Sequence, residues 1–258
     1  MANTLFTGKV YQCFDELPST NDYLLELLAK SKPPEGMAIR AASQSAGRGQ
    51  YGSRWESTPG QNLTLSVLFY PNWLAVGDQF FLSMAVALAV RDTVEGSGWK
   101  ATGTAPPPIT VKWPNDIYVG SKKVAGILIQ NSLQGHTLQA TVVGIGLNVN
   151  QRVFSDDLPN PTSMALVYGR EFVLEEVVDA LFENLERQYL QLKAGQQSAL
   201  KTIYEDQLFQ KGVLSKFVLP DGTNFSGILL GVTDRGLLCI QIGNAVHQFE
   251  TKAVKLCL

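Results

Sequence analysis

Residues 109–130 read ITVKWPNDIYVGSKKVAGILIQ and indicate the class of fold. Two apolar runs rich in β-branched residues, Ile109–Trp113 and Val124–Gln130, stand on either side of a polar turn. Short apolar runs bounded by turn residues are typical of strands. Pro114 ends the first strand, because proline has no N–H for a strand ladder. A third run, Leu138–Val149, follows. We therefore predict that all three strands lie in one sheet.

Helical patterns stand on both sides of these strands. Asn21–Lys30 and Leu174–Lys193 repeat apolar side chains at helical spacing. Phe80–Val94 is apolar on nearly every side, as a buried helix would be. Leu63–Phe69 adds another predicted strand before it. Helices combined with a sheet of this kind predict an α+β fold.

The composition changes near Lys211. From residue 212 to residue 258, apolar runs alternate with turns at Pro220–Gly222, Asp234–Gly236 and Gly243-Asn244. About five short strands in this space predict a small β-barrel or sandwich. We therefore expect two domains, residues 1–211 and residues 212–258. Glycine and proline also predict a surface loop over residues 97–108.

Bulk composition excludes several classes of protein. The chain has 258 residues, 45% hydrophobic and 17% charged, with a formal net charge of −2, which does not suggest a nucleic-acid coat. Its three cysteines lie far apart, and its two histidines are too few for a typical zinc site. No apolar secretory segment begins the chain, and no apolar stretch is long enough to cross a bilayer. A cytoplasmic protein that does not enter membranes is expected.

A glycine loop at residues 47–55, GRGQYGSRW, predicts an anion-binding site. Its three glycines permit close approach of the backbone to a ligand, and successive N–H groups can surround an anion. Arg48 and Arg54 add permanent positive charge. Lys112, Asn115 and Asp116 gather at the strand end beside Pro114, where they either bind an anion with its metal or form a solvated turn.

Three further motifs follow, and two of them allow two interpretations. Lys123 opens an apolar strand that contains Gly126, so the lysine either reaches a carboxylate in a pocket or is solvated at the surface. Gly144–Asn148, GIGLN, permits a close backbone approach but is not a dinucleotide fingerprint. Ser19-Thr20-Asn21 either caps a helix or binds a small polar head group.

Together these motifs resemble the biotin–protein ligase (biotin–[acetyl-CoA-carboxylase] ligase) family in order and spacing, from near Leu17 to the end of the chain. The matching elements are Ser19-Thr20-Asn21, Gln44 with Gly47–Trp55, Asn62-Leu63, Lys112–Asp116, Lys123–Leu128 and Gly144–Asn148. The resemblance implies a mixed β-sheet with helices, like the class II aminoacyl-tRNA synthetase core. It also implies that the C-terminal domain is an SH3-like β-barrel.

The family's reaction is implied with the resemblance. Biotin and ATP give biotinyl-5′-AMP, and a lysine of the biotin carboxyl carrier protein of acetyl-CoA carboxylase then takes the biotinyl group. ATP, biotin and Mg²⁺ are the implied ligands. The chemistry needs fixed cations and alignment rather than a protein nucleophile, because a carboxylate and a triphosphate repel each other.

The resemblance also implies roles for individual residues. The implied biotin-binding residues are Ser19, Thr20, Asn21, Gln44, Arg48, Gly49, Gln50, Lys123, Gly126 and Leu128. The implied ATP- and adenylate-binding residues are Gly47, Arg48, Trp55, Lys112, Asn115 and Asn148. The implied catalytic residues are Lys123, Arg48, Lys112 and Asp116, and Asp116 is also the implied Mg²⁺ ligand.

Two positions depart from the family pattern. Many members have arginine where Gln50 and Ser53 stand, so the loop carries less positive charge here. We expect this difference to affect retention of the adenylate rather than the class of reaction. Ser19 leaves few residues for an N-terminal DNA-binding domain, so we expect no DNA binding. We also expect a monomer or a homodimer. The alternatives are a lipoate–protein ligase-like enzyme and a non-catalytic biotin-binding module.

Overall fold

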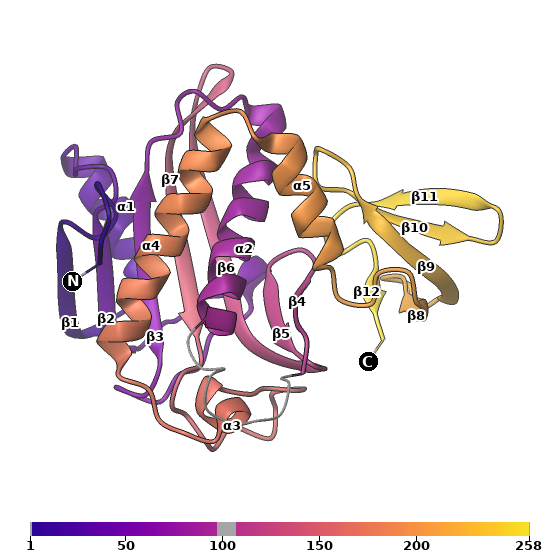
Figure 1. Cartoon of the computed structure of the whole chain (residues 1–258), viewed down its shortest axis with the longest axis horizontal. Helices are drawn as coiled ribbons and strands as arrows, with labels where there is room; N and C mark the ends of the chain where they lie inside the picture. The colour runs from indigo at the N-terminus through magenta and orange to yellow at the C-terminus, as the bar shows by residue number, and fades with distance from the viewer. Residues whose placement is uncertain (1, 97–106, 258) are drawn as a thin grey trace.

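The computed structural model describes residues 2–96 and 107–257 and contains two sheets (Figure 1). The strands of the first sheet are β1 (Tyr11–Leu17), β2 (Ala38–Gln44), β3 (Leu63–Phe69), β4 (Ile109–Lys112), β5 (Asp116–Val119), β6 (Lys122–Gln134) and β7 (Thr137–Leu147). The helices are α1 (Thr20–Lys30), α2 (Gln79–Gly96), α3 (Met164–Tyr168), α4 (Leu174–Lys193) and α5 (Gln197–Asp206), with short 3-10 turns at Gln50–Gly52 and Val76–Asp78.

The first sheet is mixed. Its strand order is β1-β2-β3-β7-β6-β5-β4, and β1 pairs with β2 in parallel while the other neighbours are antiparallel. The three strands predicted from Ile109–Trp113, Val124–Gln130 and Leu138–Val149 lie together in it. This arrangement confirms the predicted α+β class and the mixed sheet.

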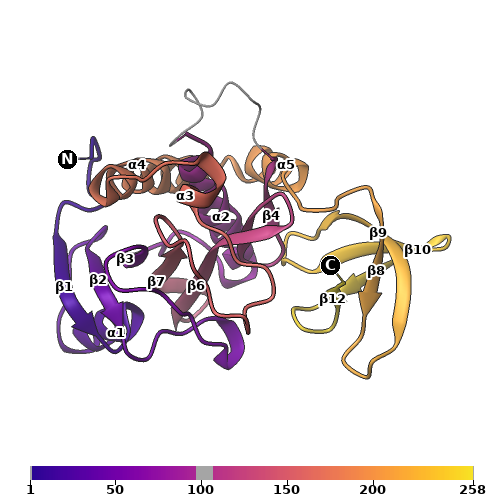
Figure 2. The ribbon, with the colours of Figure 1, turned by 90° about the horizontal axis from the view of Figure 1, so that it is seen from below.

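Helices cover both faces of this sheet (Figure 2). α2 lies between the sheet and α4, and its residues 84–90 are all buried, because this segment has no polar face. α1 lies on the opposite face, where Leu24 packs with Ile39 and Leu68 in a second apolar cluster. The end of α1 that begins at Thr20 is thereby held beside β2 and β3, which positions the polar residues 19–21.

The second sheet is antiparallel and lies at the C-terminal end of the chain (Figures 1 and 2). Its strands are β8 (Leu214–Val218), β9 (Asn224–Val232), β10 (Leu238–Ile242), β11 (Ala245–Phe249) and β12 (Lys255–Leu256), in the order β11-β10-β9-β8-β12. The indole Nε1 of Trp113 donates a 3.0 Å hydrogen bond to the carbonyl of Gly236. A residue from the predicted site motif therefore contacts the second sheet's β9–β10 turn.

The segment that connects the two sheets forms hydrogen bonds along β4, the edge strand of the first sheet. The N–H of Val111 in β4 donates to the carbonyl of Gln207 at 2.7 Å, and the N–H of Phe209 donates to the carbonyl of Val111 at 2.9 Å. This segment covers a strand edge that would otherwise expose unpaired backbone groups. It also ties the C-terminal sheet to the strand that carries Lys112.

Two other expectations concern the described residues. Most of the surface loop predicted over residues 97–108 lies outside them, with only Pro107 and Pro108 inside. Across residues 2–96 and 107–257, no helix has the length and apolar character that crossing a membrane requires.

Candidate functional site

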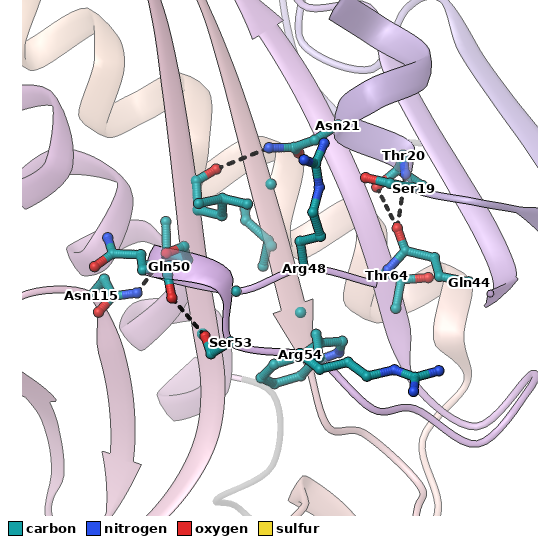
Figure 3. Close-up of a pocket in the computed structure, with 18 of the residues that line it drawn as sticks. Ser19, Thr20, Asn21, Gln44, Arg48, Gln50, Ser53, Arg54, Thr64 and Asn115 are labelled. Carbon is teal, nitrogen blue, oxygen red and sulfur yellow. Dashed lines mark hydrogen bonds between the residues drawn. The ribbon is translucent and has the colours of Figure 1, made fainter. Parts of the chain in front are cut away.

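A cavity of about 170 Å³ lies between the glycine loop and the first sheet (Figure 3). The start of α1, the end of β2, and β3, β6 and β7 form its other walls. Its lining residues are Ser19, Thr20, Asn21, Gln44, Arg48, Gly49, Gln50, Ser53, Arg54, Trp55, Thr64, Leu65, Asn115, Asp116, Lys123, Gly126, Ile127, Leu128, Gly144, Ile145 and Gly146. Most of the residues that the sequence assigned to a site are therefore brought together.

One end of the cavity is polar and built at the start of α1. Ser19 is the N-cap, and its hydroxyl accepts the N–H of Asp22 at 3.3 Å. The N–H of Thr20 donates to Oε1 of Gln44 at 2.8 Å. Helix capping and cavity lining thus occur in the same short segment, so the two interpretations of Ser19-Thr20-Asn21 are compatible. All three side chains are nearly buried.

Glycines in β6 and β7 make room for the side chains that face them. A Cβ built on Gly144 would lie 2.9 Å from Cγ of Asn21. On Gly146 it would lie 2.6 Å from Cζ2 of Trp55, and on Gly126 3.1 Å from Cζ3 of the same ring. At Gly144 and Gly146 a neighbouring side chain occupies the space that a Cβ would take, whereas at Gly126 the ring would need to move only slightly. Trp55 therefore covers the floor of the cavity at its other end.

The glycine loop closes on itself. The N–H of Gly49 donates to the carbonyl of Ser53 at 2.7 Å, and the N–H of Trp55 donates to the carbonyl of Gly47 at 3.1 Å. The hydroxyl of Ser53 also donates to the carbonyl of Gln50 at 2.7 Å. Figure 3 shows Arg48 extending toward the first turn of α1, where it forms an ion pair with Asp22.

The charges around the cavity are predominantly positive. Nζ of Lys123 lies 2.7 Å from Oδ1 of Asp116 and 5.5 Å from the centre of the Trp55 ring. Among the lining residues, Arg48, Arg54 and Lys123 carry positive charge, and Asp116 alone carries a carboxylate. With Asp22, which pairs with Arg48 but does not line the cavity, the balance is three cations to two carboxylates, and it favours binding of an anionic ligand.

Three of the predicted site residues lie outside the cavity lining. Gly47 lies at the base of the glycine loop, next to Arg48. Lys112 points instead over the ring of Tyr118, with 5.2 Å between the ammonium and the ring centre. Burial lowers the pKa of Lys112, and the nearby Asp116 carboxylate offsets part of that effect. Asn148 is buried, and its amide donates to the carbonyl of Thr162 at 2.9 Å.

Two buried polar atoms near these residues have no hydrogen-bond partner within the described part of the chain. They are Nε1 of Trp55 and Oδ1 of Asn148. Buried donors and acceptors in proteins are nearly always paired, with protein, water or ligand. An unpaired donor at Trp55, which lines the cavity, is suited to a ligand that brings an acceptor.

Several cavity residues had no site role in the sequence analysis. Thr64, Leu65, Ile145 and Gly144 come from strands at the centre of the sheet. The period-two pattern of Leu63–Phe69 was visible in the sequence, but it did not show which face lines a cavity. Ser53 and Arg54 were noted in the glycine loop, and both line the cavity.

The donor set suits a metal ion that arrives with its ligand. Within residues 2–96 and 107–257, no group of three or more His, Cys, Asp or Glu side chains could hold an ion by itself. Asp116 offers one carboxylate at the cavity wall, beside Asn115. Mg²⁺ is often held by one or two carboxylates together with substrate phosphates, so the residues present fit that mode.

Comparison with protein families gives one match that covers about half of the chain. The family described as "Biotin/lipoate A/B protein ligase family" matches residues 13–148. This span contains the start of α1, the glycine loop, the Lys112–Asp116 turn and Lys123. It also ends on Asn148.

Curated relatives match over most of their length. The chain is 31% identical over 227 residues to a biotin–[acetyl-CoA-carboxylase] ligase of Mycobacterium tuberculosis, covering 87% of this chain and 80% of the relative. It is 27% identical over 252 residues to the bifunctional ligase/repressor BirA of Bacillus spizizenii, covering 96% of this chain and 73% of that protein.

A solved structure matches the fold across nearly the whole chain. It is the biotin protein ligase from Aquifex aeolicus in complex with biotin and ATP, with a TM-score of 0.78 and 25% identity. The match covers 96% of this chain and 99% of that one, so both sheets are included.

Proposed function

The chain belongs to the biotin/lipoate A/B protein ligase family, and we propose that it is a biotin–[acetyl-CoA-carboxylase] ligase. It activates biotin with ATP to biotinyl-5′-AMP and transfers the biotinyl group to a lysine of a biotin carboxyl carrier protein. The observation that carries this proposal is one cavity that has a polar end at residues 19–21 and three cations, Arg48, Arg54 and Lys123, among its lining residues. Such a cavity suits a small molecule with a polar ring at one end and a carboxylate at the other.

In the first step, a carboxylate oxygen of biotin attacks the α-phosphorus of ATP, and the bond to the β-phosphate oxygen breaks. Both reactants are anions, so the barrier falls when fixed cations face the developing charge. Lys123 and Arg48, which both line the cavity, supply that charge. The backbone of Gly49 and the side chain of Gln50 close over the same region, which aligns the two substrates and limits hydrolysis.

Asp116 and Asn115 would hold Mg²⁺ together with the phosphates, and the ion would neutralise charge on the phosphate oxygens. Lys123 is paired with Asp116 in the absence of substrate. When the phosphates are bound, Lys123 turns from this carboxylate to the reacting oxygens. Lys112, Gly47 and Asn148 are outside the cavity lining, and we assign them to the nucleotide rather than to biotin.

In the second step, the neutral amine of the carrier lysine attacks the carboxyl carbon of the adenylate. The carbon–oxygen bond to AMP breaks, an amide forms, and the amine loses a proton. The protein supplies no nucleophile of its own. Its part is to hold the activated carboxyl group, with Lys123 and Arg48 on its oxygens, until the carrier arrives.

The polar end of the cavity favours biotin over lipoate. Ser19, Thr20, Asn21 and Gln44 bring several hydrogen-bonding groups to one place. The dithiolane ring of lipoate has no N–H groups and only weak sulfur acceptors. It would leave these groups unpaired at a cost of about 1–3 kcal/mol each, whereas the cyclic urea of biotin can pair with them. A non-catalytic module would not need a lysine and carboxylate pair at the carboxyl end.

The finer points of architecture and context are part of the proposal. Residues 1–211 form the catalytic domain, similar to the class II aminoacyl-tRNA synthetase core, and residues 212–258 form an SH3-like barrel. The Trp113–Gly236 contact supports their cooperation in one site. A cytoplasmic location, a monomer or homodimer, and the lack of DNA binding stay predictions.

A direct reaction tests the proposed function. The protein is incubated with biotin, MgATP and a biotinyl carrier domain of acetyl-CoA carboxylase. We expect release of pyrophosphate and a carrier heavier by one biotinyl group. Lipoate in place of biotin, and a carrier with its lysine changed to arginine, serve as controls. Folded protein that forms neither the adenylate nor the biotinylated carrier would refute the proposal.

A further inference from the structure

Behind the polar end of the cavity lies Ser66 of β3, a residue that is completely buried and does not line the cavity. Its Oγ lies 2.6 Å from Oδ1 of Asn21 and 2.7 Å from Oγ1 of Thr20. It stands opposite Gly144 in the pairing of β3 with β7, and Asn21 occupies the space that this glycine leaves. Ser66 therefore joins two proposed biotin-binding residues.

The orientation of the Asn21 amide is fixed by the backbone. Its nitrogen lies 3.3 Å from the carbonyl oxygen of Leu128 and 2.7 Å from Oε1 of Gln130. A carbonyl oxygen can only accept, so the group that faces it must be the amide nitrogen. Both N–H groups of Asn21 are then used by protein acceptors. Oδ1 is turned toward Ser66, and toward a ligand it can act only as a hydrogen-bond acceptor.

This orientation determines the direction of the next two hydrogen bonds. Oδ1 of Asn21 cannot donate, so the single proton of the Ser66 hydroxyl must go to it. The 2.7 Å contact between Ser66 and Thr20 then needs the Thr20 proton, which makes Thr20 the donor there. Oγ1 of Thr20 lies farther, 3.2 Å, from Oε1 of Gln44. Thr20 is left with lone pairs for a ligand, like Asn21.

Gln44 is oriented in the opposite sense by a second backbone group. Its Oε1 accepts the N–H of Thr20, which can only donate. The amide N–H groups of Gln44 are then left for a ligand acceptor. Ser19 can also donate, because its Oγ accepts the N–H of Asp22 and keeps its own proton. The cavity end presents two acceptors and two donors.

We infer that Ser66 is a positioning residue that passes the hydrogen-bond polarity of Asn21 on to Thr20, so that both residues act as acceptors for ligand N–H groups. This inference rests on the proposed function, because it assumes that the ring of biotin occupies the polar end. It predicts specificity for a cyclic urea, with two N–H groups flanking a carbonyl. A cyclic carbamate of the same shape, in which oxygen replaces one N–H, would place two acceptors against each other.

The test measures binding without ATP, by calorimetry, for biotin and for both cyclic carbamate isomers of biotin. We expect the wild-type protein to bind at least one carbamate about 100-fold more weakly than biotin, since a buried acceptor loses its partner. In Ser66→Ala, the Thr20 proton can turn to a ligand acceptor or to Oε1 of Gln44, 3.2 Å away. Biotin affinity should fall about tenfold, and the discrimination against that carbamate should fall to about tenfold.

A matched variant controls for the loss of a buried hydroxyl. Thr141 of β7 is also completely buried, and its hydroxyl donates to Oδ1 of Asn131 at 2.8 Å. Thr141→Val should leave the affinities for biotin and the carbamates, and their ratio, within twofold. Ser66→Cys fills the site with a larger side chain that keeps a weak donor, so it repeats the test if Ser66→Ala does not fold.

Two results would overturn the inference. One is an unchanged biotin affinity in Ser66→Ala and Ser66→Cys. The other is an equal loss for biotin and the carbamates, which is what a merely structural role would give. Because no ATP is present, failure of the ligase reaction would not alter this ratio. The two hypotheses are therefore tested separately.

Discussion

Nζ of Lys123 lies 2.7 Å from Oδ1 of Asp116, and both side chains face the same cavity. The two residues come from neighbouring strands, β6 and β5. The pair holds the lysine at the cavity wall before any substrate arrives. The proposed reaction needs the charge of Lys123 on the reacting oxygens, so the substrates must compete with Asp116 for it.

The first prediction concerns Lys123. Lys123→Ala should slow adenylate formation by roughly 100-fold or more, the scale seen when one preorganised donor is removed. Pyrophosphate release in a single turnover measures the step directly. Lys122→Ala is the matched control, because Lys122 is the exposed neighbour and does not line the cavity. Equal rates in the two variants would exclude the proposed role of Lys123.

The second prediction concerns Asp116 and Mg²⁺. Asp116→Asn keeps the shape of the side chain but removes the carboxylate at the cavity wall. We expect the Mg²⁺ concentration for half-maximal adenylation to rise by roughly tenfold, as when a metal site loses a supporting group. Asp157→Asn, on an exposed loop, provides the comparison. An unchanged Mg²⁺ dependence would mean that Asp116 serves only to hold Lys123.

The third prediction concerns retention of the intermediate. Gln50 lines the cavity in the loop that carries Arg48. Gln50→Arg adds a permanent cation near the adenylate phosphate, so the adenylate should dissociate several-fold more slowly than from the wild-type protein. A chase of labelled adenylate with unlabelled substrate measures this rate. Gln12→Arg adds the same charge on the exposed edge strand β1 and should have no effect. Equal dissociation from wild type and Gln50→Arg would contradict the prediction.

Local patterns predicted much of the fold. The apolar face of Leu174–Lys193 gave α4 with the same bounds, and Pro114 marked the turn between β4 and β5. β1 was not predicted, because this edge strand is polar and largely exposed, with no apolar alternation. β5 was not predicted either, since its four residues follow directly on the polar turn. Periodicity detects a strand only when one of its faces is regularly buried.

The sequence indicated which residue types form the site, but not toward which partners their side chains point. Sequence motifs placed Arg48 and Lys123 at an anion, and both line the cavity. Arg48 pairs with Asp22, and Ser66 forms hydrogen bonds with Thr20 and Asn21. Both arrangements depend on contacts between α1, β3 and the glycine loop. Such contacts arise only when strands distant in sequence are paired. Lys112, named in a motif, points instead to Tyr118 of β5, the next strand along the chain.

The fourth prediction concerns Gly146 in β7. Its missing Cβ leaves room for the ring of Trp55, which would lie 2.6 Å from a Cβ there. Gly146→Ala should push the indole into the cavity and reduce adenylation by about tenfold or more, with little loss of stability, because a misplaced wall disturbs alignment of the substrates. Gly77→Ala is the control, since a Cβ at Gly77 meets open space. Tryptophan fluorescence during a biotin titration reports whether the surroundings of the Trp55 ring have changed. Normal adenylation by Gly146→Ala would show that Trp55 does not shape the site.

The fifth prediction concerns stability at acid pH. The carboxylate of Glu186 in α4 accepts the N–H groups of Leu5, Phe6 and Thr7 at 2.5, 2.9 and 2.9 Å. Burial alone would raise the pKa of Glu186, but these hydrogen bonds to the charged form outweigh it and lower the pKa below the ordinary value of 4.5. A lowered pKa contributes stability that is complete above the unfolded value and is lost as the pH falls through the folded one.

Glu186→Gln should therefore destabilise the protein most near pH 7, by about 1–3 kcal/mol, because a buried amide presents donors to backbone donors. The difference from wild type should shrink below pH 4.5, since the wild-type carboxylate becomes protonated there while glutamine does not titrate. Urea unfolding at pH 7 and at successively lower pH measures it. Glu183→Gln is the comparison, because Glu183 lies on the same helix and accepts one exposed N–H, from Asn3. A constant difference between wild type and Glu186→Gln at every pH would mean that the charge on Glu186 does not hold the N-terminal segment against α4.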